Sequence, residues 1–233
     1  MSQESPVPPN QYDSFADKYL NGLDKKPHNA FYERPAMIQM MPDVRGKTVL
    51  DAGCGNGWYA EHLLEAGANV TVVDASEKML ENVQVRTSGK VECVLWDLNK
   101  PLTWAKSDSF DFVFSSLTLH YLQNWTIVLS EFSRVLRHSG RLLFSIHHPF
   151  ADWQIFRKEN YFATTKIEDD WGFPVHFYRR SLSAIMDAVI DAGFQIEKLI
   201  EPFPTEEFLK IDPNGHQTLT TSPLFLILLC RKP

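Results

Sequence analysis

The sequence predicts an α/β fold in which a doubly wound, mostly parallel β-sheet is covered by helices on both faces. Short apolar runs rich in valine, leucine and phenylalanine alternate along the chain with segments of helical periodicity. A turn with three glycines, at residues 53–57, follows the first apolar run. Because alternating strands and helices require right-handed crossovers, we expect ligands to bind at the carboxyl ends of the strands.

Seven strands and the helices between them account for most of the chain. The expected strands span residues 48–50, 70–73, 91–95, 110–115, 142–146, 194–200 and 224–230. Ser76 and Asn124 are placed to cap helices, whereas Gly67, Gly140 and Gly193 are placed to end them. No helix of crossover length is evident between the last two strands, so we expect them to pair antiparallel at the sheet edge.

The N-terminal residues 1–44 precede this alternation and are expected to form a helical lid. Apolar positions at helical spacing predict a helix after Asn10. A second helix is expected over residues 35–41, because Pro35 suits a first helical turn. With no internal repeat or long linker, we expect residues 1–233 to form a single domain.

The segment between the fifth strand and the next helix, residues 147–180, is longer than a strand-to-helix loop needs. Irregular segments of such length are uncommon unless they are functional. This one is rich in aromatic side chains, and residues 161–167 and 175–179 are expected to pair as a hairpin. We interpret it as a cap over the active site; a satellite core or a dimer contact is the alternative.

The composition is that of an ordinary globular domain. The chain has 233 residues, of which 44% are hydrophobic and 22% charged, and its formal net charge is −6. The acidic balance and the lack of a basic stripe argue against a nucleic-acid partner. The three cysteines have neither metal-ligand nor disulfide spacing, so we expect no metal. Without a secretion-signal pattern or an apolar run of roughly 20 residues, we expect a cytoplasmic monomer or homodimer with no membrane contact.

The glycine turn and its neighbours carry the functional signal. Residues 49–57 read Val-Leu-Asp-Ala-Gly-Cys-Gly-Asn-Gly, and Asp74 closes the next apolar run. Glycine has no Cβ, so such a turn can bend sharply and approach a ligand closely. An acid at the end of the second strand, about twenty residues further on, can accept both hydroxyls of a ribose. These residues predict a nucleotide-like cofactor.

A dinucleotide-dependent oxidoreductase is the first alternative. Its G-x-G-x-x-G fingerprint requires a small residue where this chain has Trp58, which would obstruct a pyrophosphate at the helix N-terminus. Asp51, two residues before the first glycine, would repel phosphates but attract an ammonium group. The turn therefore indicates a cofactor that carries a cationic amine rather than NAD.

The same pattern resembles the cofactor loop of class I S-adenosylmethionine (SAM)-dependent methyltransferases, and the resemblance extends over residues 45–145 and 181–233. It implies a Rossmann-like, seven-stranded sheet with an antiparallel last strand. The implied SAM-binding positions are Asp51, Gly53 and Gly55 for the methionine part, Asp74 with Ala75 for the ribose, Met79, Asp97 and Leu98 for the adenine, and Ser115 for the methionine ammonium. In the lid, the resemblance implies that Tyr12, Tyr19 and Arg34 approach the cofactor carboxylate.

Methyl transfer to an oxygen atom of high pKa needs a base, and histidine titrates near neutrality. His147 and His148 follow the fifth strand, and we expect one of them to face the transferred methyl group while the other points away. His120, Trp153 and Tyr178 are expected to line the acceptor site. The expected activity is methyl transfer to an oxygen or nitrogen of a small, partly apolar acceptor. A thiol, amine or carboxylate acceptor would need no base.

Two other functions keep the same cofactor pocket. A non-catalytic SAM-binding partner or regulatory protein would retain the pocket without the chemistry. A protein- or RNA-modifying enzyme is the other alternative. The fourth strand continues as Phe-Ser-Ser-Leu-Thr-Leu-His and lacks an Asn/Asp-Pro-Pro-Tyr motif, which argues against methylation of exocyclic amines.

Overall fold

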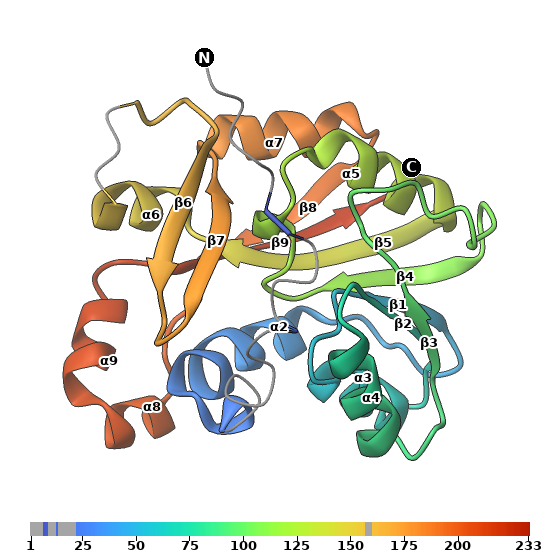
Figure 1. Ribbon diagram of the computed structural model, residues 1–233, viewed down its shortest axis with the longest axis horizontal. Coiled ribbons are helices and arrows are strands. Elements are labelled where there is room, and N and C mark those ends of the chain that lie inside the picture. Colours follow the sequence, from blue (N-terminus) through green and yellow to red (C-terminus); the bar gives the residue numbers. More distant parts are fainter. Residues whose placement is uncertain (1–6, 9–12, 14–21, 157–159) are drawn as a thin grey trace.

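The expected seven-stranded sheet forms the centre of the molecule (Figure 1). The computed structural model describes residues 7–8, 13, 22–156 and 160–233. The strands of the sheet are β1 (Thr48–Ala52), β2 (Asn69–Asp74), β3 (Glu92–Leu95), β4 (Phe110–Ser115), β5 (Leu136–His147), β8 (Gln195–Ile200) and β9 (Phe225–Arg231). Their order is β3-β2-β1-β4-β5-β9-β8. Strands β1 to β5 run parallel, and β9 runs antiparallel to both β5 and β8, which confirms the predicted topology.

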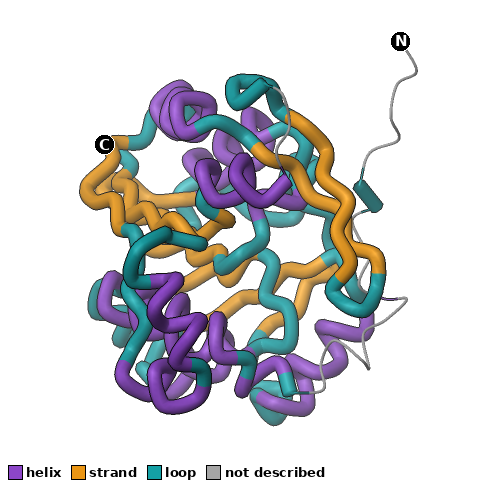
Figure 2. The backbone as a smooth tube through the Cα atoms, turned by 90° about the vertical axis from the view of Figure 1, so that its left-hand side faces the viewer, coloured by secondary structure: helices purple, strands orange, loops and turns teal. Residues whose placement is uncertain are grey.

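Helices cover both faces of this sheet, as Figures 1 and 2 show. The described helices and helical turns are η2 (Leu23–Lys25), η3 (Asn29–Glu33), α2 (Arg34–Met40), α3 (Trp58–Glu65), α4 (Glu77–Arg86), η4 (Leu119–Tyr121), α5 (Trp125–Val135), α6 (Pro149–Phe156), α7 (Leu182–Asp191), α8 (Glu206–Ile211) and α9 (Pro213–Leu219). Ser76 caps α4 by accepting from the Met79 amide at 3.2 Å, and Asn124 caps α5 by accepting from the Thr126 amide at 2.9 Å. Both caps were predicted. The helix expected after Asn10 lies outside the described residues.

The central strands are buried on both faces, which explains their nearly continuous apolar sequences. In β1, the neighbouring residues Val49 and Leu50 are both fully buried but belong to different hydrophobic clusters. Successive side chains of a strand point to opposite faces, so each central strand contributes to both clusters. The Leu50 cluster includes Phe132 of α5, and the Val49 cluster includes Leu63 of α3. The two helical layers are therefore fixed to one rigid sheet.

Gly140 departs from its predicted role. It was expected to end the preceding helix, but α5 ends at Val135 and the chain enters β5 directly at Leu136. Gly140 lies inside β5, where an added Cβ would lie 2.8 Å from the Arg137 carbonyl oxygen of the same strand and 3.1 Å from the Asp111 carbonyl oxygen of β4. The prediction was wrong because the close approach of these backbone carbonyls, rather than a helix end, explains the glycine here.

The segment after β5 forms a layer of its own beside the carboxyl end of that strand (Figure 1). It consists of α6 and an antiparallel hairpin of β6 (Thr165–Asp170) and β7 (Pro174–Arg179), in which Ile167 pairs with Phe177. The predicted hairpin is therefore present, with its first strand shifted toward the turn. Ile167, Phe177 and their neighbours form a small hydrophobic cluster against which Tyr121 of η4 packs. This packing joins the hairpin to the segment that follows β4.

Candidate active site

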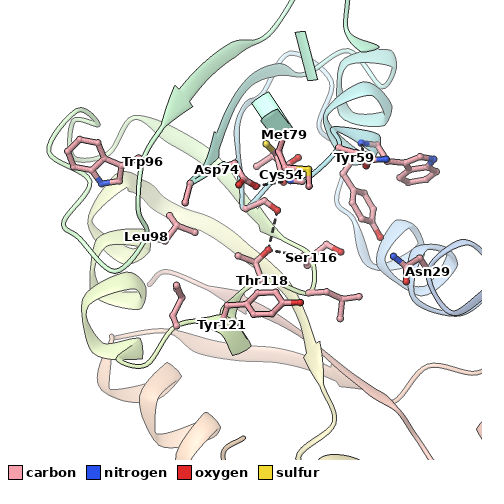
Figure 3. A pocket seen from close by; sticks show the side chains of 18 of the residues that line it. Asn29, Cys54, Tyr59, Asp74, Met79, Trp96, Leu98, Ser116, Thr118 and Tyr121 are labelled. Atoms are coloured by element: carbon pink, nitrogen blue, oxygen red, sulfur yellow. Dashed lines mark hydrogen bonds between the residues drawn. The ribbon is translucent and has the colours of Figure 1, made fainter. Parts of the chain in front are cut away.

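A cleft opens at the carboxyl ends of β1, β2 and β4, where the topology predicts a ligand. The cleft is open to solvent, and the space in and above it amounts to about 1090 Å³. Figure 3 shows Trp96 and Leu98 at one end of the cleft, Tyr59 at the other, and Asp74 with Met79 between them. The predicted cofactor residues that line it are Arg34, Asp51, Gly53, Gly55, Asp74, Ala75, Met79, Asp97 and Leu98. Segments far apart in the sequence thus meet at one place, while Tyr12 and Tyr19 lie outside the described residues.

The glycine turn requires glycine for two physical reasons. The φ angles of Gly53, Gly55 and Gly57 are 79°, 51° and 78°, in the left-handed region that other residues rarely adopt. An added Cβ would also lie 2.2 Å from the Thr118 side chain at Gly53 and 2.8 Å from that of Val83 at Gly57. Gly55 has open space around the same position. The turn therefore presents bare backbone to the cleft.

Asp74 is held at the end of β2 by the backbone around it. Its Oδ2 atom accepts a hydrogen bond from the Gly55 amide at 2.9 Å, and its Oδ1 atom accepts one from the Ser76 amide at 3.0 Å. Burial raises the pKa of this carboxyl, and the two backbone bonds act in the opposite direction. The carboxyl group is thereby fixed in orientation at the edge of the glycine turn.

Asp51 carries an unsatisfied oxygen in the cleft. The residue is 1% exposed, and its Oδ2 atom has no hydrogen-bond partner among the described residues. Burial, together with the nearby Asp74 carboxylate, raises the pKa of Asp51 to about 8. An unsatisfied buried polar group costs roughly 1–3 kcal/mol. A cationic amine from a ligand would supply both the missing donor and the missing charge.

The end of the cleft near β3 combines apolar walls with one carboxylate. Asp97 accepts bonds from the amide and the side-chain nitrogen of Asn99, both at 2.9 Å and both on Oδ1. Leu98 and Met79 are buried beside it. A flat, partly apolar ring with an exocyclic donor suits this arrangement.

The residue that lines the cleft after β4 differs from the expected one. Ser115 is fully buried and its hydroxyl donates to the Ala52 carbonyl at 2.8 Å. Its successor Ser116 lines the cleft instead, followed by Leu117 and Thr118. Strand β4 ends at Ser115 as predicted, but the Ser115 side chain points into the protein interior, so the cleft is lined from the next residue onward.

Arg34, Trp58 and Glu33 form a further part of the cleft wall. The sequence predicted a cofactor contact for Arg34 but none for Trp58 or Glu33. The Arg34 guanidinium lies 4.3 Å from the centre of the Trp58 ring, and its Nη1 donates to the Asp24 carbonyl at 2.8 Å. Trp58 therefore forms a wall of the cleft at the position where a dinucleotide fold needs a small residue. Glu33, which sequence reasoning missed, also lines the cleft. Nothing in its local sequence marks it, because its contacts depend on how η3 meets the sheet.

The two histidines after β5 have different surroundings. His148 Nε2 lies 2.9 Å from a carboxylate oxygen of Glu201, beyond the end of β8. His147 Nδ1 lies 3.6 Å from Asp152 Oδ1, and its ring stacks on that of His120 with centroids 4.0 Å apart. Burial lowers the pKa of His147 to about 4. None of these histidines lines the cofactor cleft; His120 and His147 border a separate small cavity with Asp152.

The other predicted acceptor-site residues also lie on the side of the hairpin. Tyr178 borders the same small cavity as His147, and its hydroxyl accepts from the Val7 amide at 3.1 Å. Trp153 of α6 packs against the rings of Phe150 and Tyr161, and its Nε1 atom has no partner among the described residues. Tyr121 lines the cofactor cleft while its ring lies 4.2 Å from that of His120. One aromatic ring thus separates the histidine pair from the cleft.

Comparison with known proteins agrees with this geometry. A family profile described as a methyltransferase domain matches residues 50–144. An uncharacterized protein of Haemophilus influenzae is 30% identical over 230 residues, with 88% of each chain covered. The crystal structure of a proposed SAM-dependent methyltransferase from Listeria monocytogenes has a TM-score of 0.78 and 29% identity, covering 86% of this chain and 96% of that one. A malonyl-[acyl-carrier protein] O-methyltransferase of Erwinia billingiae is 34% identical over 116 residues, 47% of this chain and 45% of the relative.

The chain belongs to the class I SAM-dependent methyltransferases, and SAM is the cofactor expected in its cleft. The glycine turn and the unsatisfied oxygen of Asp51 fit that cofactor. In the described part of the chain, no helix is long and apolar enough to cross a membrane. Those residues also contain no group of three or more histidine, cysteine or acidic side chains that could hold a metal ion.

Proposed function

We propose that this protein transfers the methyl group of SAM to an oxygen or nitrogen atom of a small, partly apolar acceptor. The observation that carries the proposal is the buried, unsatisfied oxygen of Asp51 in a cleft lined by glycine backbone. SAM presents an ammonium group that this oxygen can accept. A dinucleotide would present phosphates, which the Asp74 carboxylate would repel and which carry no cationic donor for Asp51.

Each part of the cofactor has a proposed partner in the cleft. Asp74 accepts the ribose hydroxyls, Asp97 accepts the adenine amino group and Asp51 accepts the methionine ammonium. Arg34 pairs with the methionine carboxylate, because its guanidinium is held over Trp58 at the edge of the cleft. The assignment of Tyr12 and Tyr19 to the same carboxylate stays a prediction. SAM supplies an activated methyl group, so the residues of the chain mainly align the reactants, which is worth up to roughly 7–11 kcal/mol in favourable systems.

The acceptor is proposed to enter between the cleft and the hairpin of β6 and β7. The surroundings there are aromatic and include Tyr121, Phe177 and Trp171. Such a lining favours a flat, partly apolar molecule. The O-methyltransferase of E. billingiae, matched over 45% of its length, favours an oxygen acceptor.

His147, rather than His148, is the proposed base. Asp152 Oδ1 lies 3.6 Å from its Nδ1 atom, which has no hydrogen-bond partner among the described residues; we propose that this contact tightens when the acceptor binds and leaves Nε2 to accept the proton. Burial holds the imidazole neutral at physiological pH, and the neutral form is the one that can act as a base. During transfer the acceptor O–H bond breaks, its proton moves to His147 Nε2, and the oxygen electron pair forms the new bond to carbon as the carbon–sulfur bond breaks. His148 is occupied by Glu201.

Two measurements on the purified protein test this proposal. Calorimetric titration with SAM, with its demethylated product S-adenosylhomocysteine (SAH) and with NAD⁺ should show binding of the first two alone. Incubation with methyl-¹³C SAM and a panel of phenols, heteroaromatic amines and carboxylic acids should then yield a labelled phenol or amine. Binding of NAD⁺ in place of SAM would contradict the cofactor assignment. SAM binding without transfer to any member of the panel would favour the non-catalytic alternative.

A further inference from the structure

Glu33 is a buried carboxylate at the wall of the cofactor cleft, and the proposed function gives it no role. It is 1% exposed and ends η3, a turn of π-helix between η2 and α2. π-Helical turns are rare and frequently occur at functional sites. This turn brings the Glu33 side chain from the N-terminal segment to the ends of the central strands.

Three hydroxyl groups from three parts of the fold hold the Glu33 carboxylate. Its Oε1 atom accepts from Ser145 of β5 at 2.6 Å and from Ser116, just after β4, at 2.8 Å. Its Oε2 atom accepts from the Tyr59 hydroxyl of α3 at 2.7 Å. These donors fix the position of the carboxylate, but all of them are neutral.

Glu33 forms no ion pair at short range within the described part of the chain. Burial raises the pKa of its carboxyl, and the three hydroxyl donors and the charge of the adjacent Arg34 act in the opposite direction. Buried carboxylates in proteins are normally paired with a cation, because removing a charge from water is costly. Across the described residues, no lysine, arginine or histidine forms an ion pair with Glu33. The adjacent Arg34 directs its guanidinium over Trp58 and toward the Asp24 carbonyl. A cationic ligand group beside the carboxylate would supply the close ion pair that the described residues do not form.

SAM carries two cationic centres, the methionine ammonium and the sulfonium, and only the sulfonium disappears when the methyl group leaves. In the proposed function the ammonium pairs with Asp51. Glu33 is bonded to Ser116, just after β4, and to Ser145, two residues before the end of β5, so we place it near the point where the acceptor meets the methyl group. We infer that Glu33 is the counter-charge for the sulfonium and makes the cleft discriminate SAM from SAH. The inference rests on the proposed function. It assigns to Glu33 the role of binding SAM more tightly than its product SAH.

The test compares the affinities of SAM and SAH by calorimetry in the wild type and in Glu33→Gln. Glutamine keeps the shape and an acceptor oxygen but removes the charge. We expect SAM to bind about 10- to 100-fold more weakly, as for loss of a charge-assisted interaction, and SAH to change less than about threefold. The matched control is Glu61→Gln, because Glu61 pairs with Arg86 and has a side chain 41% exposed; it should leave both affinities unchanged.

An equal loss of affinity for SAM and SAH would overturn the inference. It would mean that Glu33 only holds the surrounding structure in place or interacts with the ammonium group that both ligands carry. Unchanged affinities would overturn the inference as well. If Glu33→Gln does not fold by circular dichroism, the ratio of SAM to SAH affinity in the wild type gives the same comparison as the pH is lowered, because protonation of Glu33 removes the same charge while Asp51 acts on both ligands alike; the ratio should fall. Failure of the proposed function would look different, because the wild type would then bind neither SAM nor SAH.

Discussion

The two halves of the carboxyl edge of the sheet are built in different ways. At the ends of β1 to β3, the cleft is open and lined by backbone, glycine and fixed carboxylates such as Asp51 and Asp74. At the end of β5, beneath the β6–β7 hairpin, the surroundings are closed and aromatic, and the polar groups are the stacked rings of His120 and His147 beside Asp152. The first half suits a cofactor whose structure is constant. The second half is formed by inserted elements, which can change with the acceptor while the sheet stays the same.

Replacing His147 with asparagine should give the largest difference between the two halves, because it should abolish most of the methyl transfer and leave SAM binding unchanged. Methyl transfer to a phenolic acceptor should fall about 10²- to 10⁴-fold, the usual contribution of a general base. SAM affinity measured by calorimetry should not change, because His147 lies outside the cofactor cleft. His148→Asn should retain transfer and lose less than about 1 kcal/mol of unfolding free energy, since its partner Glu201 is half exposed. If the His148 variant is the inactive one, the assignment of the base is reversed.

Asp74→Ala should affect the cofactor half alone. Loss of two charge-assisted hydrogen bonds to the ribose should weaken SAM about 100-fold or more. The fold should persist, because the two backbone amides that donate hydrogen bonds to Asp74 can donate to water in the open cleft instead. Calorimetry gives the affinity and circular dichroism the folded state, with the exposed Asp187→Ala as the matched control. An affinity within threefold of the wild type would remove Asp74 from the ribose site.

The pH dependence of SAM binding should report on Asp51. In the free protein its pKa is raised to about 8, so below that pH the carboxyl is protonated and must release a proton to pair with an ammonium. SAM affinity should therefore rise by up to about tenfold per pH unit between pH 6 and pH 8. Asp51→Asn should bind SAM weakly with a flat profile. A flat profile in the wild type would show that Asp51 is already ionised or does not contact the ligand.

Trp58→Ala should have the smallest effect. Without the ring under its guanidinium, Arg34 loses a cation–π contact of about 0.5–1 kcal/mol and part of its fixed orientation. SAM should bind about two- to fivefold more weakly in calorimetry, with the acceptor side unaffected. No change in affinity would mean that Asp24, through its carbonyl and its carboxylate 3.7 Å from Nη2, orients Arg34 without the ring.

The cofactor half was predictable from the sequence because its residues follow one rule of local spacing. A glycine turn after a strand and an acid at the end of the next strand meet in any parallel sheet of this order. Ser115 and Ser116 show the limit of that rule, since β4 ends at Ser115 as predicted but the strand bounds do not tell which of the two residues faces the cleft. The sheet itself was also predictable, because strands buried on both faces have distinctive apolar runs.

The acceptor half and Glu33 depend on long-range contacts that no local pattern encodes. The sequence indicated that one of two adjacent histidines should point inward, but the choice between them depends on where α6 begins and brings Asp152. Glu33 is held by residues 26 to 112 positions away in the chain. Gly140 was misread because its crowding arises from the path of β5 itself, at the Arg137 carbonyl, and from a tertiary contact with the Asp111 carbonyl.

A crystal structure of the protein grown with SAH tests the central claim most directly. We expect the ribose hydroxyls on the Asp74 carboxylate, the adenine beside Leu98 and the ammonium against the free oxygen of Asp51. An empty cleft at saturating SAH, or an adenosyl group bound with its methionine end away from Asp51, would contradict the account.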